Sequence, residues 1–240
     1  MKNFNLSVDT LRVTTEGASG KATRKNGVVR MDQSLSPVRI AFDGDPQDRD
    51  LREMREGLNA LGFDELVISA SQTSVLDEAN DTFSVENAVV NLEDGFNLSY
   101  DYKGSGLSSI KSIDQDNMSP DEIESMLGNM KLNSMNMALT DYNLVDRIIK
   151  FVAEQQGTSE ALIRMQAKGG LMVLSLGAQN EAQGKALSDI GSALGNFIDD
   201  GGTLKIQLNP ETPVSVDQFT NMDPQSLDPA ELGFSIEHVK

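Results

Sequence analysis

The chain has 240 residues, no cysteine and a formal net charge of −17 at pH 7. A chain of this length buries enough apolar surface to fold as one large domain or as two small ones without cross-links. The absence of cysteine excludes disulfides, thiolate metal sites and thiol catalysis. The excess of carboxylates disfavours binding to nucleic acid and to anionic lipid surfaces. No apolar run approaches the ~20 residues of a membrane-spanning helix.

Residues 4–43 alternate between apolar and polar side chains, which predicts a meander of β-strands. Asn26-Gly27 is a strong signal for a two-residue hairpin turn. Ser36-Pro37 predicts the entry to a further strand over residues 38–42.

Four basic side chains gather around this hairpin, and they are the only concentrated positive charge in an acidic protein: Lys21, Arg24, Lys25 and Arg30. One hypothesis is a clamp for a phosphate or a lipid headgroup. The more ordinary interpretation is a solvated hairpin tip.

Four aspartates between residues 43 and 50 raise the question of calcium, but they lack the glycine of the EF-hand loop, and Pro46 interrupts them. A helix start explains them better. We expect Asp45 to cap the helix, Pro46 to take its first position, and Asp48 and Asp50 to lie in the first turn. The helix should then run to about Leu61.

Residues 63–107 return to a β pattern, with a turn at Asp94-Gly95 and clean alternation over residues 96–102. Such alternation indicates an antiparallel sheet with one buried and one wet face. Residues 108–118 read as a loop between a β-rich half with one helix (1–107) and a helix-rich half with flanking strands (119–240). One continuous domain, 1–240, fits the same pattern.

Residues 119–139 combine a capping box at the start of a helix with a following strand, and they are dense in methionine. Thioethers select Cu(I), but no histidine or cysteine lies nearby. We therefore expect no metal site here, and interpret the methionines as core filler or as the lining of a pliant apolar groove.

Residues 140–202 form a proline-free helical block that predicts three helices, with stops at Gly157 and at Gly201-Gly202. Each glycine inside a helix costs roughly 1 kcal/mol relative to alanine, so close approach of a backbone or of a ligand is expected to offset it. Strands are expected at residues 203–208, 214–216 and 234–238. A helix end that leads into a strand recurs along the chain, which suggests two duplicated β-α units.

The expected fold class is therefore α+β, with a curved, mostly antiparallel sheet packed by helices. The chain starts almost inside a strand. This fits a cut downstream of a signal or anchor segment, and it fits a native cytosolic start equally well.

Three sequence segments resemble those of uncharacterised bacterial envelope proteins of the YdgA-like and AsmA-like kind: residues 81–85 with 92–98, residues 137–141 with 144–149, and residues 202–210. The resemblance implies an inner-membrane anchor upstream of this chain and a β-rich periplasmic body that handles lipid or maintains the envelope. It offers no catalytic residue to carry over.

The sequence contains few candidate catalytic residues. The only histidine, His238, lies two residues before the last, so a Ser-His-Asp or Cys-His site has no base in a scaffolded position. We therefore expect a protein that is not an enzyme and needs no cofactor.

Two functions remain open. The first is a structural or protein-interaction module of the envelope that pairs with partner proteins through exposed sheet edges. The alternative is a module that binds lipid or another amphiphile in an apolar groove between sheet and helices. The residues expected to line such a groove are Met126, Met130, Met135, Met137, Ile148, Leu171 and Leu174.

Overall fold

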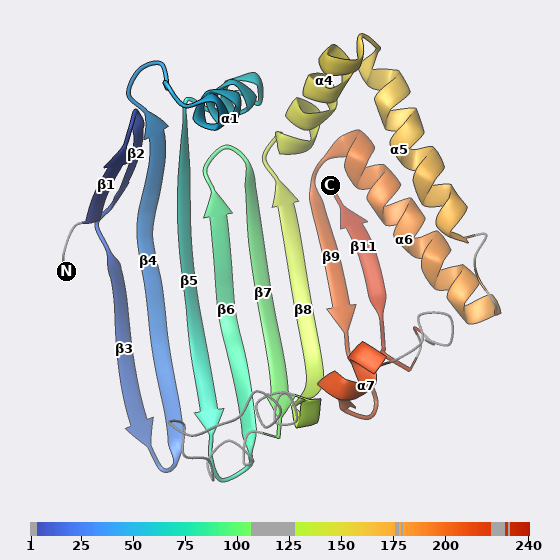
Figure 1. Ribbon diagram of the computed structural model, residues 1–240. Helices are drawn as coiled ribbons and strands as arrows, with labels where there is room; N and C mark the ends of the chain where they lie inside the picture. Colours follow the sequence, from blue (N-terminus) through green and yellow to red (C-terminus); the bar gives the residue numbers. More distant parts are fainter. Residues whose placement is uncertain (1–3, 107–127, 176–177, 179, 222–228, 230) are drawn as a thin grey trace.

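The computed structural model describes residues 4–106, 128–175, 178, 180–221, 229 and 231–240. These residues form an α+β protein with one large open sheet (Figure 1). The strands are β1 (Phe4–Val8), β2 (Leu11–Thr15), β3 (Ala18–Lys25), β4 (Val28–Phe42), β5 (Glu65–Asp77), β6 (Thr82–Leu92), β7 (Phe96–Ser105), β8 (Lys131–Asp141), β9 (Thr203–Leu208), β10 (Val214–Ser215) and β11 (Ser235–Val239). The helices are α1 (Arg49–Ala60), α4 (Leu144–Gln156), α5 (Glu160–Ser175), α6 (Glu181–Asp200) and α7 (Val216–Asn221).

The sheet follows the chain in the order β1-β2-β4-β5-β6-β7-β8-β9-β11, with β3 beside β4 and β10 beside β8. Every described pairing is antiparallel. Strands β7 and β8 pair from Phe96 with Asp141 to Ser105 with Lys131. One sheet therefore runs through both halves of the chain, and the three helices α4 to α6 are inserted between two paired strands, β8 and β9.

The strand registers give the sheet two chemically different faces. Cross-strand partners point to the same face, and sequence neighbours point to opposite faces. One row across β5 to β9 is apolar: Ala70, Val90, Leu98, Leu139 and Leu204. A row on the other side is polar: Ser69, Asn91, Asn97, Thr140 and Thr203. We call these two sides the apolar face and the polar face.

Three β-bulges keep the faces in phase over long strands. They fall between Leu35 and Val38 in β4, between Val85 and Ala88 in β6, and opposite the Lys103–Gly104 step in β8. A bulge adds one residue to one strand, so the apolar side chains on both sides of it stay on the same face. Asn87, the extra residue of β6, takes a positive φ of 51°.

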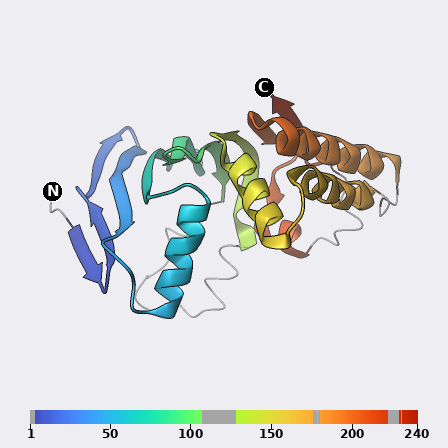
Figure 2. The same cartoon turned by 90° about the horizontal axis from the view of Figure 1, so that it is seen from above.

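The helices lie on the apolar side of the sheet. Phe197 and Ala193 of α6 pack on Leu204 of β9, and Leu139, Ile206 and Ile236 join this cluster. A second cluster links α4 and α5 through Ile149, Ala153 and Ile163. Seen from above, the sheet is bent, and α1 and α4 lie on its inner side (Figure 2).

The expected fold class is confirmed, and three local predictions need correction. Residues 28–42 form one strand with a bulge at Ser36-Pro37, not two strands. Helix α1 is capped by Asp48, whose side chain accepts hydrogen bonds from the backbone of residues 50 and 51, whereas Asp45 forms an ion pair with Arg55 at 2.6 Å. The strand at residues 214–216 is shorter, because Val216 begins α7.

Candidate functional site

The candidate site is the apolar face of strands β4 to β8. On β4 and β5 it consists of Val29, Met31, Gln33, Leu35, Val38, Ile40, Phe42, Leu66, Ile68, Ala70, Gln72, Ser74 and Leu76. On β6 and β7 it consists of Phe83, Val85, Ala88, Val90, Leu92, Phe96, Leu98, Tyr100, Tyr102 and Gly104. These four strands are fully described, and none of these positions carries a charged side chain.

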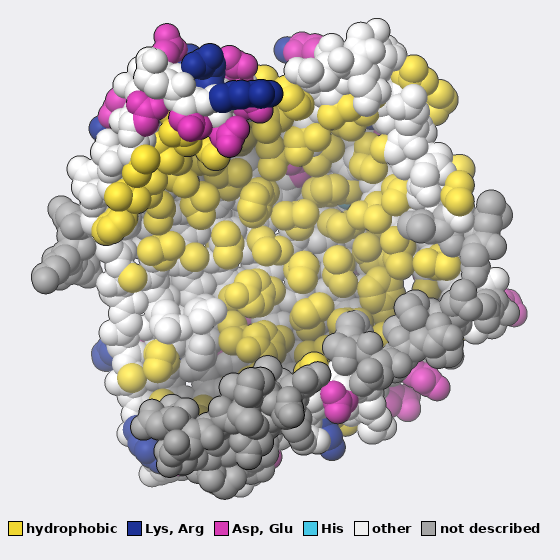
Figure 3. Space-filling view, in the orientation of Figure 1, with side chains coloured by type: hydrophobic (Ala, Val, Ile, Leu, Met, Phe, Trp, Pro, Cys, Tyr) yellow, Lys and Arg dark blue, Asp and Glu magenta, His cyan; other side chains and the backbone are white. Residues whose placement is uncertain are grey.

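The described helices do not cover the middle of this face. Among the described residues, only Val85 and Ala88 of the apolar-face side chains on β4 to β7 are buried, and the other large ones are partly exposed. Met31, for example, is 38% exposed. Figure 3 looks onto this face and shows hydrophobic side chains gathered across the sheet, below the charged outer surface of α1. Soluble monomers rarely expose an apolar patch larger than ~300–600 Å² without a function for it.

Small residues make a hollow in this surface. Its volume is about 470 Å³, and Ala18, Gly20, Ala70, Val90 and Tyr100 are among its lining residues. A Cβ atom added at Gly20 would meet only the backbone oxygen of Asp32, at 3.9 Å. The hollow is therefore open above Gly20, and a larger side chain there would fill it.

Helix α1 borders the apolar face at one end of the strands. Its apolar side carries Leu51, Met54 and Leu58, yet no residue of the helix is buried and Met54 is 50% exposed. Arg147 of α4 holds the far end of α1. Its Nη1 donates a hydrogen bond to the Leu61 carbonyl at 3.4 Å, and its guanidinium lies 5.0 Å from the centre of the Phe63 ring.

Helix α4 has two apolar sides. One side packs into the cluster with α5 through Val145, Ile149 and Ala153. The other, at the same helical spacing, carries Leu144, Ile148 and Phe151, of which Ile148 is 42% exposed. A helix that buries one apolar side and leaves a second one open is typical of the wall of a binding surface.

At the opposite end of β8 lies a smaller apolar pocket of about 350 Å³, the terminal pocket. It is lined by Leu132, Met135, Leu208, Pro210, Val214, Ser215, Val216 and Leu232. It forms where β10 pairs with the first residues of β8, beyond the end of β9.

Tyr102 brings a phenol to the apolar face. Its ring packs edge-to-face with Phe83, with centroids 5.6 Å apart, and Met135 is its cross-strand partner. Burial among these apolar groups raises the pKa of Tyr102 above its ordinary value of 10.0, and the neighbouring Tyr100 adds to the effect. Water is therefore partly excluded from this part of the face.

The residues predicted to line a groove do not all meet at one place. Met135 and Met137 lie on the apolar face of β8, opposite Tyr102 and Tyr100. Ile148 lies on the open side of α4. Leu171 instead lines a separate hollow between α5 and α6.

The remaining three predicted groove residues are less informative. Met130 precedes β8, and its carbonyl accepts a hydrogen bond from Val216 at 2.8 Å. Met126 and the side chain of Leu174 lie outside the described residues.

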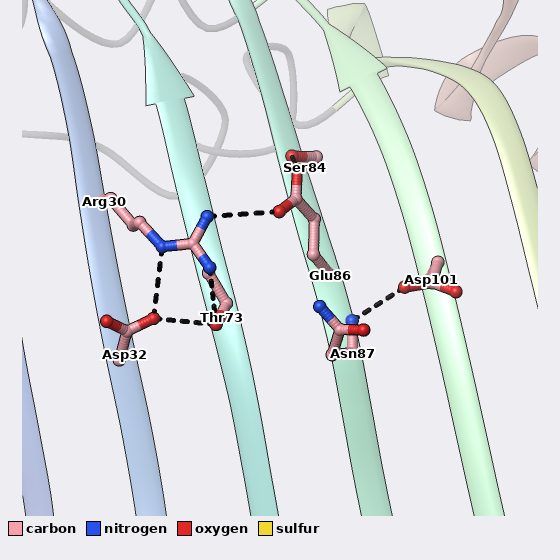
Figure 4. A network of polar contacts seen from close by, with 7 residues as sticks. All are labelled: Arg30, Asp32, Thr73, Ser84, Glu86, Asn87 and Asp101. Atoms are coloured by element: carbon pink, nitrogen blue, oxygen red, sulfur yellow. Dashed lines mark hydrogen bonds and ion pairs between the residues drawn. The ribbon is translucent and has the colours of Figure 1, made fainter.

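The four basic residues predicted to bind a headgroup are divided between the two faces. Arg24 lies on the apolar side and pairs with Glu78 at 2.6 Å, whereas Lys21, Lys25 and Arg30 lie on the polar side. Arg30 is held by a network on the polar face that includes Asp32, Thr73 and Glu86 (Figure 4). The structure therefore does not bring the four together as one clamp.

Sequence reasoning missed the part of the site that β4 to β7 supply, above all Ala70, Val90, Leu98 and Tyr100. The signal was present in the period-two alternation of these strands, which predicted one apolar face. The sequence did not indicate that the described helices would leave this face without a covering layer.

Within the described ranges, no three His, Asp or Glu side chains are grouped to hold a metal ion. No described helix is long and apolar enough to cross a membrane. A family model described as "Uncharacterized protein" matches residues 89–239, which include the last residues of β6, the strands β7 to β11 and the helices α4 to α7. No curated protein matches the chain.

Proposed function

We propose that this chain, which belongs to the uncharacterized protein family whose model matches residues 89–239, binds the acyl chains of a lipid on the apolar face of its sheet. The observation that carries the proposal is the apolar face of β4 to β7, which the described helices leave uncovered. Acyl chains need only apolar contact, and the strand backbones beneath them already pair with one another.

The energetics support a ligand on this face. Each Å² of apolar surface removed from water contributes roughly 25 cal/mol, so an uncovered face retains a large unused driving force for binding. The open sides of α1 and α4 give an acyl chain on the sheet contact from more than one direction. The polar face, with its ion pairs and hydroxyl groups, offers no such surface.

A structural module that pairs through sheet edges is the other candidate. Edge strand β1 favours it, because its apolar-face residues Phe4, Leu6 and Val8 are 53%, 47% and 53% exposed. However, an apolar face on a structural module should be closed by the protein's own core. Here the described elements leave the face open, so lipid binding ranks first.

The proposal is tested by extracting the purified protein with organic solvent and by titrating it with a fluorescent lysophosphatidylcholine. The headgroup of this probe is zwitterionic, so the net charge of −17 contributes little repulsion. We expect co-purified lipid and saturable binding. Leu98→Asp should weaken binding at least about tenfold, because a carboxylate on the apolar face must be desolvated by the bound chain.

Ser99→Asp is the matched control, since it places the same carboxylate one residue along β7 on the polar face. Equal affinities for both variants and the parent chain would show that the apolar face is not the binding surface.

A further inference from the structure

The terminal pocket is enclosed by apolar side chains from several directions, whereas the rest of the apolar face is an open surface. Strands β8, β9 and β10 contribute Leu132, Leu208 and Val214, and Pro210 and Leu232 come from the segments that follow β9 and precede β11. Leu232 is only 8% exposed. The volume of about 350 Å³ lies at the lower end of the range for small-molecule sites.

The polar groups at this pocket are already used. Among the described residues that line it, Ser215 has the only polar side chain, and its hydroxyl accepts a hydrogen bond from the backbone of Gln218 at 3.0 Å. The Ser215 N–H donates to the Gln218 side chain at 2.9 Å, and the Val216 N–H donates to the Met130 carbonyl at 2.8 Å. A headgroup placed here would lose its hydrogen bonds to water without replacement, whereas hydrocarbon would lose none.

The pocket is also continuous with the apolar face. Leu132 and Met135, two of its lining residues, begin the row on β8 that continues through Met137 to Leu139. Leu132 to Leu139 is seven steps along β8, one of which the bulge takes up, so the row covers about 20 Å. The acyl chains of one leaflet cover half of a hydrocarbon core of ~30 Å, or about 15 Å. A chain that ends in the pocket therefore fits along this row.

We infer that the terminal pocket receives the methyl end of the bound acyl chain and so makes binding sensitive to chain length. This inference rests on the proposed function and adds to it an orientation, with the headgroup toward the α1 and α4 end of the strands. Chains too short to reach the pocket lose its contacts. Each methylene that enters it raises affinity by up to about fourfold.

The test uses lysophosphatidylcholines with octanoyl, lauroyl, palmitoyl and stearoyl chains, each below its micelle concentration. Val216→Trp should block the pocket at a position that tolerates bulk, because Val216 lines it and is 41% exposed. We expect the affinity for the palmitoyl lipid to fall at least tenfold and that for the octanoyl lipid to change less than twofold. Val239→Trp, at a 38% exposed position on the polar face of β11, is the matched control.

A second variant works in the opposite direction. Leu232→Ala enlarges the pocket and should raise the affinity for the stearoyl lipid relative to that for the palmitoyl lipid. A general loss of stability would not change this ratio of affinities. If Val216→Trp weakens all chain lengths equally, or none of them, the inference is wrong even though lipid binding stands. If the parent chain binds none of these lipids, the proposed function fails with it.

Discussion

Tyr102 shows how the apolar face acts on a single side chain. Its phenol lies among Phe83, Met135 and Tyr100, and burial there disfavours the charged phenolate. The phenol is a reporter of how much water reaches the centre of the face. A lipid chain above it would remove more water and raise its pKa further.

The pH dependence of stability follows from this shift. Because the pKa of Tyr102 is raised in the folded state, the group contributes stability below the unfolded value of about 10, and that contribution is lost as the pH rises through the folded value. Tyr102→Phe should therefore lose less stability than the parent chain between about pH 9 and about pH 11. Urea unfolding at both pH values measures the difference.

Tyr142→Phe provides the control, since Tyr142 is 47% exposed and lies outside the sheet. In the parent chain, saturation with lysophosphatidylcholine should move the phenolate absorbance titration to higher pH. An unchanged titration in the presence of a bound lipid would place that lipid away from Tyr102.

Single residues also show which local features could be predicted from the sequence and which could not. Asn26 and Gly27 both take positive φ, 52° and 81°, as the hairpin signal required. The start of α1 was misplaced because Asp45 and Asp48 are both good caps. The ion pair of Asp45 with Arg55, a contact that depends on how the loop folds back, separates their roles.

At the scale of the elements, helix α6 fixes the helical layer to the sheet. Phe197 is 8% exposed, packs beside Leu204 and meets the His238 ring edge-to-face with centroids 6.4 Å apart. His238 is therefore partly buried beside this cluster, and its Nε2 donates a hydrogen bond to the Gly201 carbonyl at 2.6 Å. Over β5 to β7, on the same face, the described part of the chain has no equivalent helix.

Truncation of Phe197 should therefore be costly. Phe197→Ala removes the side chain that joins α6 to β9, and we expect a loss of about 3–5 kcal/mol in the free energy of unfolding. Val173→Ala on α5, at a position 63% exposed, should change stability by no more than about 0.5 kcal/mol. Urea unfolding of both variants measures this. Similar values for the two would mean that α6 is not anchored to the sheet.

The elements were predicted better than their arrangement. The alternation over residues 96–102 and the stops at Gly157 and Gly201 marked the ends and types of β7, α4 and α6. Local signals of this kind depend on residues close in the chain. The bulges in β4, β6 and β8 depend on partners in neighbouring strands, and no local pattern specified them.

At the scale of the whole molecule, the sheet has more apolar surface than the described helices cover. Helix α6 lies on β9 and β11, and α1 lies at one end of the strands without burying any of its own residues. The composition of the chain could not reveal this imbalance. A fully packed core and an open face contain the same apolar residues, and only the placement of the helices distinguishes them.

The predicted groove also shows that the placement of elements relative to one another could not be read from the sequence. Methionine density pointed to Met135 and Met137, and the structure does place both on the apolar face. Leu171, chosen from an apolar run in the helical block, lies in a different hollow, because the direction of α5 relative to the sheet is a long-range property. The larger share of the face comes from β4 to β7, which the sequence had assigned to an ordinary buried layer.

The most direct measurement is photolabelling with a lysophosphatidylcholine whose acyl chain carries a diazirine, followed by mapping of the labelled residues by mass spectrometry. A chain lying on the apolar face should label alternate residues of the central strands, namely Leu98 and Tyr100 on β7 and Met137 and Leu139 on β8. Their neighbours Ser99 and Ala138 on the polar face should remain unlabelled. Labels that are spread over both faces, or confined to the outer surface of the helices, would contradict the proposal that this sheet binds lipid.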